Sequence, residues 1–172
     1  MKEQKGMMIV FTGDGKGKTT AALGVALRAS GHKMKILMIQ FMKGQEKSGE
    51  HYAAIENIEI HPFGAGFLLP GGDRQPHIEA VQKGWSFMEE KIRERQYQLL
   101  ILDEIAAAVN LDLIPVKTVI DFLSRRDPAM HVILTGRNMP DPLLDMADIV
   151  TEMKEIKHIF RKGVPAREGL DY

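Results

Sequence analysis

Short apolar runs alternate with longer amphipathic segments along the whole chain. Six runs rich in Ile, Leu, Val and Met have the length and composition of β-strands, at residues 7–12, 35–41, 58–63, 99–104, 131–136 and 148–153. Apolar residues at helical spacing predict helices over residues 18–30, 76–95, 115–126 and 141–146. This alternation is typical of an α/β fold in which helices connect mostly parallel strands, and we expect one domain over residues 1–172.

Two segments rich in glycine, proline and charge do not fit this alternation. They are "PFGAGFLLPGGDRQP" at residues 62–76 and "RKGVPAREGLDY" at residues 161–172. Both are predicted to be loops. Loops of this length are uncommon inside a compact domain and often bind ligands, so each is a candidate for ligand contact.

Charge and composition narrow the classes of partner. The 172 residues include 23 basic and 23 acidic side chains, so no net positive charge favours nucleic acid or an anionic membrane. The absence of cysteine excludes a disulfide framework and thiolate metal sites. No run is long enough to cross a bilayer, and the N-terminal apolar run is too short for a signal peptide. We therefore expect a soluble cytoplasmic protein.

The stretch "FTGDGKGKTTAALG" at residues 11–24 resembles the phosphate-binding loop G-x-x-x-x-G-K-[ST], with threonine in place of the first glycine. A glycine-rich turn between a strand and a helix directs backbone N–H groups toward one point, where a polyphosphate can bind. The predicted phosphate contacts are Thr12, Gly13, Asp14, Gly15, Lys16, Gly17, Lys18, Thr19 and Thr20. For Lys16, a phosphate contact and a solvated side chain are equally consistent with the sequence.

Within this loop, Lys18 would place its ammonium group against the phosphates, and the Thr19 hydroxyl would bind Mg²⁺. Asp103 and Glu104 end the predicted strand "LLILDE", at the sheet edge where open α/β sheets bind their ligands. Their carboxylates can bind Mg²⁺ directly or through its water. Arg137 follows the next strand, where its guanidinium suits either phosphate or a surface ion pair.

Other catalytic patterns are missing from the sequence. The six histidines show no spacing typical of a zinc site, and no Ser-His-Asp or Cys-His set can be identified. The chemistry is therefore expected to need no protein nucleophile. Phe67 lies in "GAGFLLPGG", where flanking glycines disfavour a buried strand, and an exposed apolar loop near a nucleotide suggests a large, flat hydrophobic ligand.

Taken in order, several motifs resemble the P-loop family of ATP:corrinoid adenosyltransferases. They are "TGDGKGKTTAALG", "IQFMKG" followed by "GE" at Gly49 and Glu50, "GAGF", "LDE", "LTGR", "ADIVTEM", "KHIF" and "GVPAREGLDY", spread over residues 8–172. The loop that begins with Thr12 is this family's usual variant. The resemblance implies transfer of the 5′-deoxyadenosyl group of ATP to the Co(I) of a corrinoid, with release of triphosphate. It also implies a reversed orientation of the triphosphate, a homodimer and an electron-donor flavoprotein as a transient partner.

The resemblance extends to individual residues. It implies a catalytic role for Lys18 with the leaving triphosphate and unassigned positions near the site for Gln40 and Lys43. For Arg28 it implies a nucleotide contact, although a solvated side chain on the helix is equally consistent with the sequence. Phe67 matches an aromatic residue that helps to exclude the lower axial ligand of the corrinoid. Leu69 stands where well-known members have tryptophan, and leucine still excludes water.

Two other functions fit parts of the sequence. A P-loop kinase or ATPase that acts at the γ-phosphate would use the same loop and the same carboxylates. A regulator that binds nucleotide or corrinoid without turnover would keep the fold, although the intact Lys18, Thr19 and Glu104 favour an enzyme.

Overall fold

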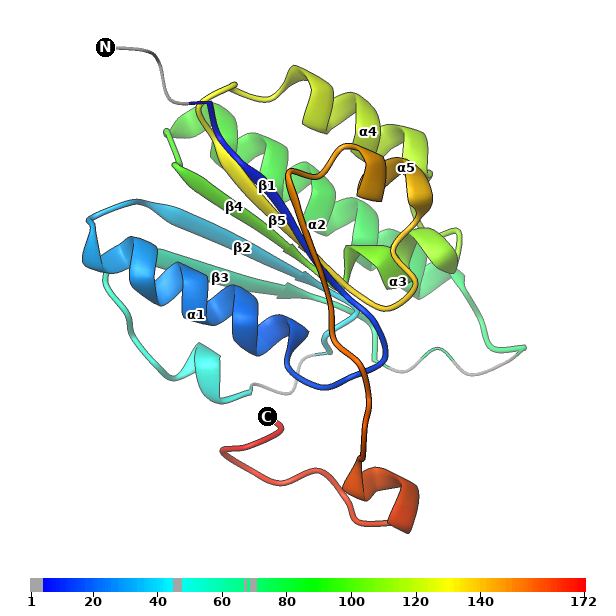
Figure 1. The fold of residues 1–172 in the computed structure, drawn as a ribbon. Coiled ribbons are helices and arrows are strands. Elements are labelled where there is room, and N and C mark those ends of the chain that lie inside the picture. The colour runs from blue at the N-terminus through cyan, green and yellow to red at the C-terminus, as the bar shows by residue number, and fades with distance from the viewer. Residues whose placement is uncertain (1–4, 45–47, 67, 69–70) are drawn as a thin grey trace.

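One six-stranded sheet forms the centre of the molecule. The structure, a computed structural model, describes residues 5–44, 48–66, 68 and 71–172. The strand order is β3-β2-β4-β5-β1-β6, and each of the pairings is parallel (Figure 1). The strands are β1 (Met8–Thr12), β2 (Ile36–Phe41), β3 (Ile58–Phe63), β4 (Leu99–Asp103), β5 (His131–Thr135) and β6 (Ile149–Glu152). The predicted α/β fold with a parallel sheet is confirmed.

Helices connect these strands. They are α1 (Lys18–Gly31), α2 (Gln75–Glu94), α3 (Ile105–Asn110), α4 (Val116–Arg125) and α5 (Asp141–Asp145), with 3₁₀ turns η1 (Gly49–His51) and η2 (Ile159–Lys162). The predicted strands and helices agree with the structure to within one residue at each end. The sequence analysis missed α3, η1 and η2, which are too short to show a periodic pattern. The loop prediction for residues 161–172 is therefore wrong for its first two residues, which belong to η2, and that for residues 62–76 is wrong at its ends, which belong to β3 and α2.

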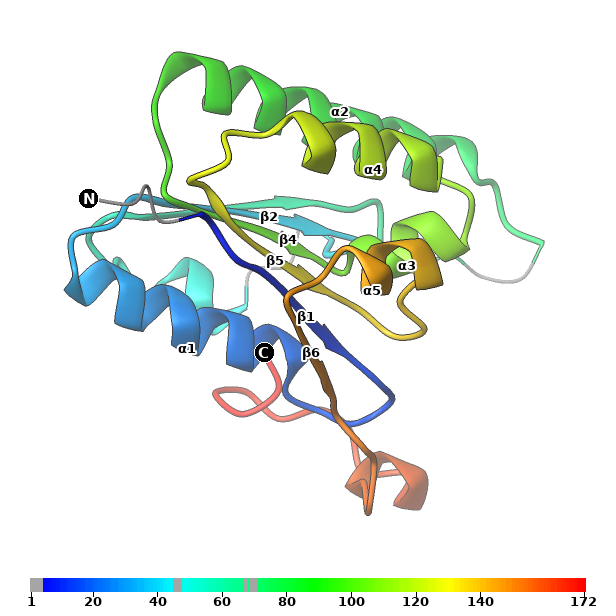
Figure 2. The ribbon, with the colours of Figure 1, turned by 45° about the horizontal axis from the view of Figure 1, so that its top comes forward.

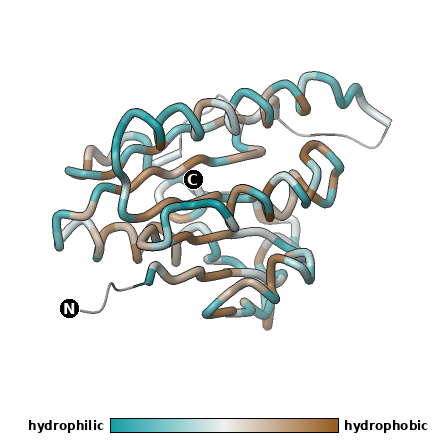
Figure 3. The backbone as a smooth tube through the Cα atoms, turned by 90° about the horizontal axis from the view of Figure 1, so that it is seen from above, coloured by the Kyte–Doolittle hydropathy of each residue, from teal (hydrophilic) through white to brown (hydrophobic). Residues whose placement is uncertain are grey.

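The helices form a layer on each side of the sheet. Helix α1 covers one face, and α2 and α4 cover the other, as Figure 2 shows. Alternation along the strands divides the core accordingly: Leu37 and Ile39 pack in the cluster that includes α2 and α4, whereas Ile36 and Met38 pack with Ala22 of α1. In Figure 3 the strands are mostly brown, while the helices alternate between brown and teal. Burial on both faces explains the nearly continuous apolar runs in the central strands.

The strand order brings distant chain segments to one edge. Strands β4 and β5 lie between β1 and β2, so α1 leaves the end of β1 and crosses the sheet before β2 begins. The carboxyl ends of these four neighbouring strands therefore meet at one edge, where a parallel α/β sheet offers a crevice for ligands. Among the helices that the structure describes, none has the length and apolarity needed to cross a membrane.

Candidate functional site

A glycine-rich loop joins β1 to the first turn of α1. Gly13 and Gly17 have φ angles of 90° and 113°, in the left-handed region that favours glycine. The N-terminal N–H groups of a helix have no partner in their own helix, and the helix dipole adds positive potential there. The Thr12 hydroxyl, which replaces the usual first glycine, accepts a hydrogen bond from the Met139 N–H at 3.3 Å. The loop therefore has the backbone geometry of an anion-binding turn.

The end of β6 supports this loop from behind. The Gly15 N–H donates to the Met153 carbonyl at 2.6 Å, and the Met153 N–H donates to the Thr12 carbonyl at 2.8 Å. A Cβ atom at Gly13 or Gly15 would lie 2.5 or 2.7 Å from the same Met153 oxygen. Close backbone approach thus explains why both positions are glycine. The motif "ADIVTEM" includes Met153, but the motif alone does not indicate that the Met153 backbone contacts the loop.

Lys18 is buried inside the loop. Its Nζ donates to the carbonyl oxygens of Gly13 at 2.7 Å and Gly15 at 2.9 Å. Burial lowers the pKa of Lys18, and the nearby Glu104 carboxylate opposes this shift. These contacts hold a cation at the centre of the loop, which suits binding of an anion. Its contact with a phosphate stays a prediction.

A buried carboxylate connects the first turn of α1 to the ends of two strands. Asp103, fully buried at the end of β4, accepts hydrogen bonds at Oδ1 from the Thr19 hydroxyl at 2.9 Å and the Thr135 hydroxyl at 2.7 Å. Gln40 Nε2 donates to its other oxygen at 3.3 Å. Burial raises the pKa of Asp103, and these three hydrogen bonds oppose the shift by stabilising the carboxylate.

Glu104 turns the chain out of the sheet. Its φ of 58° is in the left-handed region, which is uncommon for a residue other than glycine, and α3 begins at the next residue. Its N–H donates to the Thr135 hydroxyl at 2.9 Å. Burial, followed by the neighbouring Asp103 charge, raises the pKa of Glu104. A strained backbone at this position is consistent with a functional role.

Thr19, Asp103 and Glu104 together suit a hard cation. They offer only hydroxyl and carboxylate oxygens, which Mg²⁺ prefers, and the Thr19 hydroxyl already donates a hydrogen bond to Asp103. Within the described residues, no group of three or more His, Cys, Asp or Glu side chains could hold a metal ion. Such a magnesium site would therefore depend on water and substrate phosphate oxygens for the rest of its ligands.

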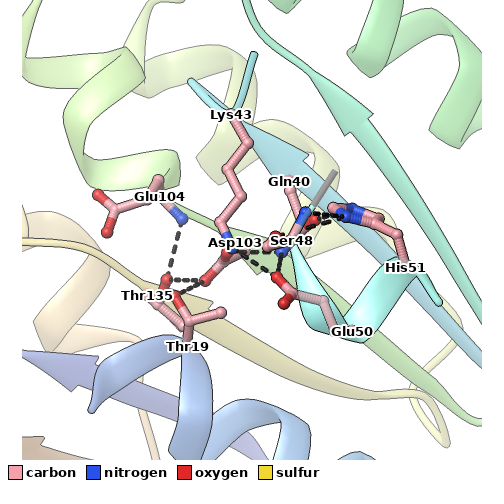
Figure 4. A network of polar contacts seen from close by, with 9 residues as sticks. All are labelled: Thr19, Gln40, Lys43, Ser48, Glu50, His51, Asp103, Glu104 and Thr135. Atoms are coloured by element: carbon pink, nitrogen blue, oxygen red, sulfur yellow. Dashed lines mark hydrogen bonds and ion pairs between the residues drawn. The ribbon is translucent and has the colours of Figure 1, made fainter. Parts of the chain in front are cut away.

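A second polar cluster extends the site to the end of β2 (Figure 4). Gln40 Oε1 lies 2.7 Å from His51 Nε2, and Gln40 Nε2 donates to Glu50 Oε1 at 3.0 Å. His51 Nδ1 accepts from the Ser48 N–H at 3.0 Å, so the neutral ring with its proton on Nε2 satisfies both contacts. Through Gln40 the cluster reaches Asp103. The sequence marked Glu50 only as part of the "GE" motif and did not point to Ser48 or His51, since only tertiary contact brings η1 to this strand end.

Lys43 completes this cluster as the ion-pair partner of Glu50, with Nζ 2.5 Å from Oε1. Burial alone would disfavour the Glu50 carboxylate. The hydrogen bonds from Lys43 and Gln40 outweigh burial and lower the pKa of Glu50 to about 2. Glu50 is therefore ionised at neutral pH, and a compact set of opposite charges lies at this end of the site.

These groups surround a cleft of about 450 Å³, a volume within the range of roughly 300–1,000 Å³ typical of small-molecule sites. The predicted residues Lys16, Gly17, Lys18, Thr19, Thr20 and Glu104 line it, together with Lys43, Glu50 and a segment near the end of the chain, residues 169–172. Asp103 lies behind Thr19. The structure therefore brings the second half of the phosphate loop and the predicted metal ligands Thr19 and Glu104 to one cleft, whereas Thr12, Gly13, Asp14, Gly15 and Asp103 do not line it.

Of the two arginines predicted to contact the nucleotide, Arg137 lies near the phosphate loop and Arg28 lies at the far end of α1. Arg137 follows β5, and its charge adds to the lowering of the pKa of Lys18 by burial and opposes the rise in the pKa of Glu104, which places it in the electrostatic surroundings of the loop. Arg28 is exposed in the last turn of α1, ten residues after Lys18, or about 15 Å along the helix axis. A nucleotide contact by either arginine stays a prediction, and Arg28 would need a ligand that extends along α1.

The residues predicted to act on the axial side of a corrinoid, Phe67 and Leu69, lie outside the described residues. Beside them in the chain, Leu68 and Arg74 line a second groove of about 440 Å³, together with Asn110, Leu111 and Asp112 at the end of α3. Arg74 donates a hydrogen bond to the Leu111 carbonyl. This contact connects the segment before α2 to the turn after α3.

The parallel sheet, the glycine loop between β1 and α1, and the carboxylates at the end of β4 define a P-loop nucleotide-binding protein. Comparison with known proteins then identifies the family. The model of the ATP:corrinoid adenosyltransferases BtuR/CobO/CobP matches residues 4–172, so the chain belongs to this family. The resemblance inferred from the motifs is confirmed.

Individual relatives agree with this assignment. The chain is 38% identical to a corrinoid adenosyltransferase of a Sinorhizobium species, over 99% of this chain and 82% of the relative. It is 36% identical to that of Escherichia coli K12 and 37% identical to that of Salmonella typhimurium LT2, each over 99% of this chain and 88% of the relative. Among solved structures, a KaiC-like protein from Pyrococcus horikoshii aligns with a TM-score of 0.47 and 16% identity, over 89% of this chain and 74% of that one.

Proposed function

We propose that this protein transfers the 5′-deoxyadenosyl group of ATP to the cobalt of a reduced corrinoid and releases triphosphate. The cleft carries this proposal, because residues 16–20 of the phosphate loop line it beside Glu104, with Asp103 bonded to Thr19, in a chain that matches the family over residues 4–172. ATP then acts as an alkylating agent. The triphosphate is proposed to lie in the loop in the orientation that presents C5′ of the ribose to the corrinoid.

The reaction needs no protein base. The electron pair of Co(I) forms the bond to C5′, the C5′–O bond breaks, and its electron pair leaves with the triphosphate, while cobalt becomes formally Co(III). Alignment of the two substrates can lower the barrier by roughly 7–11 kcal/mol where the geometry is ideal. The Lys18 ammonium and the free N–H groups at the start of α1 would stabilise the charge that develops on the triphosphate, with Arg137 adding positive potential.

Magnesium is part of this proposal. Thr19 and Glu104 would bind Mg²⁺, and Asp103, held by its hydrogen bonds to Thr19 and Thr135, would orient the Thr19 hydroxyl or a bound water. When bound, the ion would supply positive charge to the phosphate oxygens. Because burial raises the pKa of Glu104, the metal is expected to bind less tightly as the pH falls.

The corrinoid is proposed to bind beside the groove formed by Leu68, Arg74 and residues 110–112. Phe67 and Leu69, which flank Leu68 in the chain, would exclude the lower axial ligand from cobalt. Four-coordinate Co(II) is then easier to reduce to Co(I). We expect Co(II) corrinoid with ATP and the protein to show a four-coordinate spectrum, and an unchanged five-coordinate signal would reject this role for the loop.

Three further parts of the proposal come from the family resemblance. The protein is proposed to act as a homodimer, to receive electrons from a flavoprotein through a transient complex, and to work in the cytoplasm, where ATP is supplied. Size-exclusion chromatography with light scattering tests the first of these. A monomer at micromolar concentration with full activity would reject it.

The decisive experiment combines chemically reduced corrinoid, ATP, Mg²⁺ and protein under anaerobic conditions. The corrinoid spectrum should change to that of an alkylcobalt species while phosphorus NMR detects triphosphate. Lys18→Ala should lower kcat about 100-fold or more, whereas Lys117→Ala, which removes an exposed ion-pair partner of Asp121 on α4, should not change it. Formation of ADP, with the nucleoside–phosphate bond intact, would support a kinase or ATPase instead, and binding without turnover would support a regulator.

A further inference from the structure

The segment near the end of the chain folds into a compact turn. The N–H groups of Leu170 and Asp171 donate to the Arg167 carbonyl at 3.2 and 2.8 Å, and the Gly169 N–H donates to the Tyr172 carbonyl at 2.9 Å. The Asp171 side chain accepts a hydrogen bond from the Arg167 N–H at 2.8 Å. Residues 167–172 are called the C-terminal turn below. In Figures 1 and 2 it lies beside the start of α1, although about 150 residues separate the two in sequence.

Lys16 attaches this turn to the phosphate loop. Its Nζ donates to the Leu170 carbonyl at 2.8 Å and pairs with the Asp171 carboxylate. The two lysines of the loop thus have different partners, since Lys18 bonds to carbonyls inside the loop and Lys16 bonds to the turn outside it. For Lys16 the sequence left a phosphate contact and a solvated side chain as alternatives. In the structure the side chain instead bonds to the C-terminal turn.

The C-terminal turn supplies an apolar wall to the cleft. Leu170 and Tyr172 line the cleft and are 71% and 52% exposed, and Leu23 of α1 lies on the same lining. The neighbouring wall consists of Gly17, Lys18 and Thr19, which suit a polyphosphate. A ligand that matches both walls has a polyanionic end and a flat, less polar end, as a nucleoside triphosphate does.

We propose that the C-terminal turn binds the nucleoside end of ATP, with Leu170 and Tyr172 packed against it, and that Lys16 and Asp171 are positioning residues that hold the turn in place. This inference rests on the proposed function, because it assumes that the triphosphate of ATP lies on the loop. It assigns a role to Lys16 that does not require contact with phosphate. It also gives the C-terminal turn a specificity role, because triphosphate without a nucleoside would not use this wall.

The apolar wall is tested with Leu170→Ala and Tyr172→Ala, compared with Leu27→Ala, an exposed leucine of α1 that does not line the cleft. Calorimetry measures the Kd values of MgATP and of magnesium tripolyphosphate for each variant. Each variant of the turn should weaken MgATP binding roughly three- to tenfold and leave tripolyphosphate binding unchanged, whereas Leu27→Ala should change neither. An equal loss for both ligands, or a rise only in the KM for corrinoid, would overturn the assignment.

The positioning role is tested by exchanging the charges. Lys16→Met and Asp171→Asn should each raise the KM for ATP about two- to fivefold, more than they alter kcat, and the double variant should be no worse than either single one. The swapped pair Lys16→Asp with Asp171→Lys should recover most of the loss. If Lys16 instead contacts phosphate directly, Asp171→Asn will leave the KM unchanged, and the swapped pair will stay impaired and bind tripolyphosphate poorly.

The direct binding measurements separate this inference from the proposed function. If the wild-type protein forms ADP instead of triphosphate, the proposed reaction fails, yet the ratio of ATP to tripolyphosphate affinity still reports whether the C-terminal turn contacts the nucleoside. If triphosphate is formed but the ratio is the same in the wild type and in Tyr172→Ala, only the inference about the turn fails. Circular dichroism and the Tm of each variant confirm that it is folded.

Discussion

At the scale of single residues, the site depends on polar groups whose partners are already in place. Asp103 accepts hydrogen bonds from Thr19, Thr135 and Gln40, so side chains of three separate elements fix the position of one carboxylate. A buried charge without such partners would be strongly unfavourable, whereas a satisfied one defines geometry. The side chains that would hold Mg²⁺ and phosphate are therefore oriented by partners within the protein.

Glu50 makes the free energy of unfolding depend on pH. Its pKa is about 2 in the folded protein and 4.5 when unperturbed, so its charge stabilises the folded state above pH 4.5, and this contribution is lost as the pH falls toward 2. The difference corresponds to at most about 3 kcal/mol. Glu50→Gln should therefore lower the free energy of unfolding at pH 7 and flatten its decline between pH 4.5 and 2.

Urea unfolding at a series of pH values measures this effect. Glu90→Gln, at an exposed position on α2, serves as the control and should leave the pH profile unchanged. If Glu50→Gln and the wild type lose stability in parallel between pH 4.5 and 2, the ion pair with Lys43 does not stabilise the fold.

The glycines of the loop give a second prediction at this scale. A Cβ atom at Gly15 would lie 2.7 Å from the Met153 oxygen, and this neighbour is backbone that cannot move aside cheaply. Gly15→Ala should therefore displace the loop from the end of β6 and abolish detectable binding of MgATP and of tripolyphosphate. Isothermal titration with both ligands measures the loss.

Gly24 is the matched control, because a Cβ atom there would meet nothing within 4 Å and the residue lies inside α1. Gly24→Ala should raise the free energy of unfolding by about 0.5–1 kcal/mol and preserve binding. Normal binding by Gly15→Ala would show that the contact between Met153 and the loop is dispensable.

At the scale of elements, strand alternation directs the polar residues to one face. Ile36, Met38, Leu99, Ile101 and Ile133 face α1, and two residues further along each strand this face continues as Gln40, Asp103 and Thr135. The ends of β2, β4 and β5 thus deliver an amide, a carboxylate and a hydroxyl beneath the first turn of α1. Figure 4 shows them converging there.

Thr135 tests how strongly these strand ends depend on each other. Its hydroxyl donates to Asp103 Oδ1 and accepts from the Glu104 N–H. Thr135→Val removes both hydrogen bonds while nearly preserving the shape of the side chain. The variant should lose about 1–3 kcal/mol of stability and bind Mg²⁺ with ATP more weakly. Thr151→Val, at an exposed position on β6, should lose neither, and equal behaviour of the two variants would contradict the coupling.

Sequence patterns predicted the regular elements better than the irregular ones. The period of apolar residues located every strand, and the loop motif located Lys18 and Thr19, because both signals are local. The motif "GE" marked Glu50, but its contacts with Ser48 and His51 could not be predicted, since they depend on Gln40 and on a tertiary contact between η1 and the end of β2. The alternation that places Gln40 and Asp103 on the α1 face was available as a signal and went unused.

At the scale of the whole molecule, the cleft joins segments from both ends of the chain. The loop after β1, the end of β4, η1 and the C-terminal turn all contribute to it, so a ligand in the cleft would contact parts that are far apart in sequence. A ligand that binds only the folded state stabilises it by mass action. Global stability is therefore expected to report occupancy of the site.

MgATP at about 100 times its Kd should raise the free energy of unfolding by about 2.7 kcal/mol, which corresponds to a rise in Tm of roughly 5–10 °C for a chain of this size. Because the proposed metal ligands bind Mg²⁺ together with phosphate oxygens, EDTA should remove most of the rise at the same ATP concentration. Thr19→Val should behave with MgATP as the wild type does with ATP and EDTA, whereas Thr118→Val, on α4 and away from the cleft, should keep the full rise. A Tm that rises equally with and without EDTA would show that the cleft binds nucleotide without the ion, and the roles proposed for Thr19 and Glu104 as metal ligands would then be wrong.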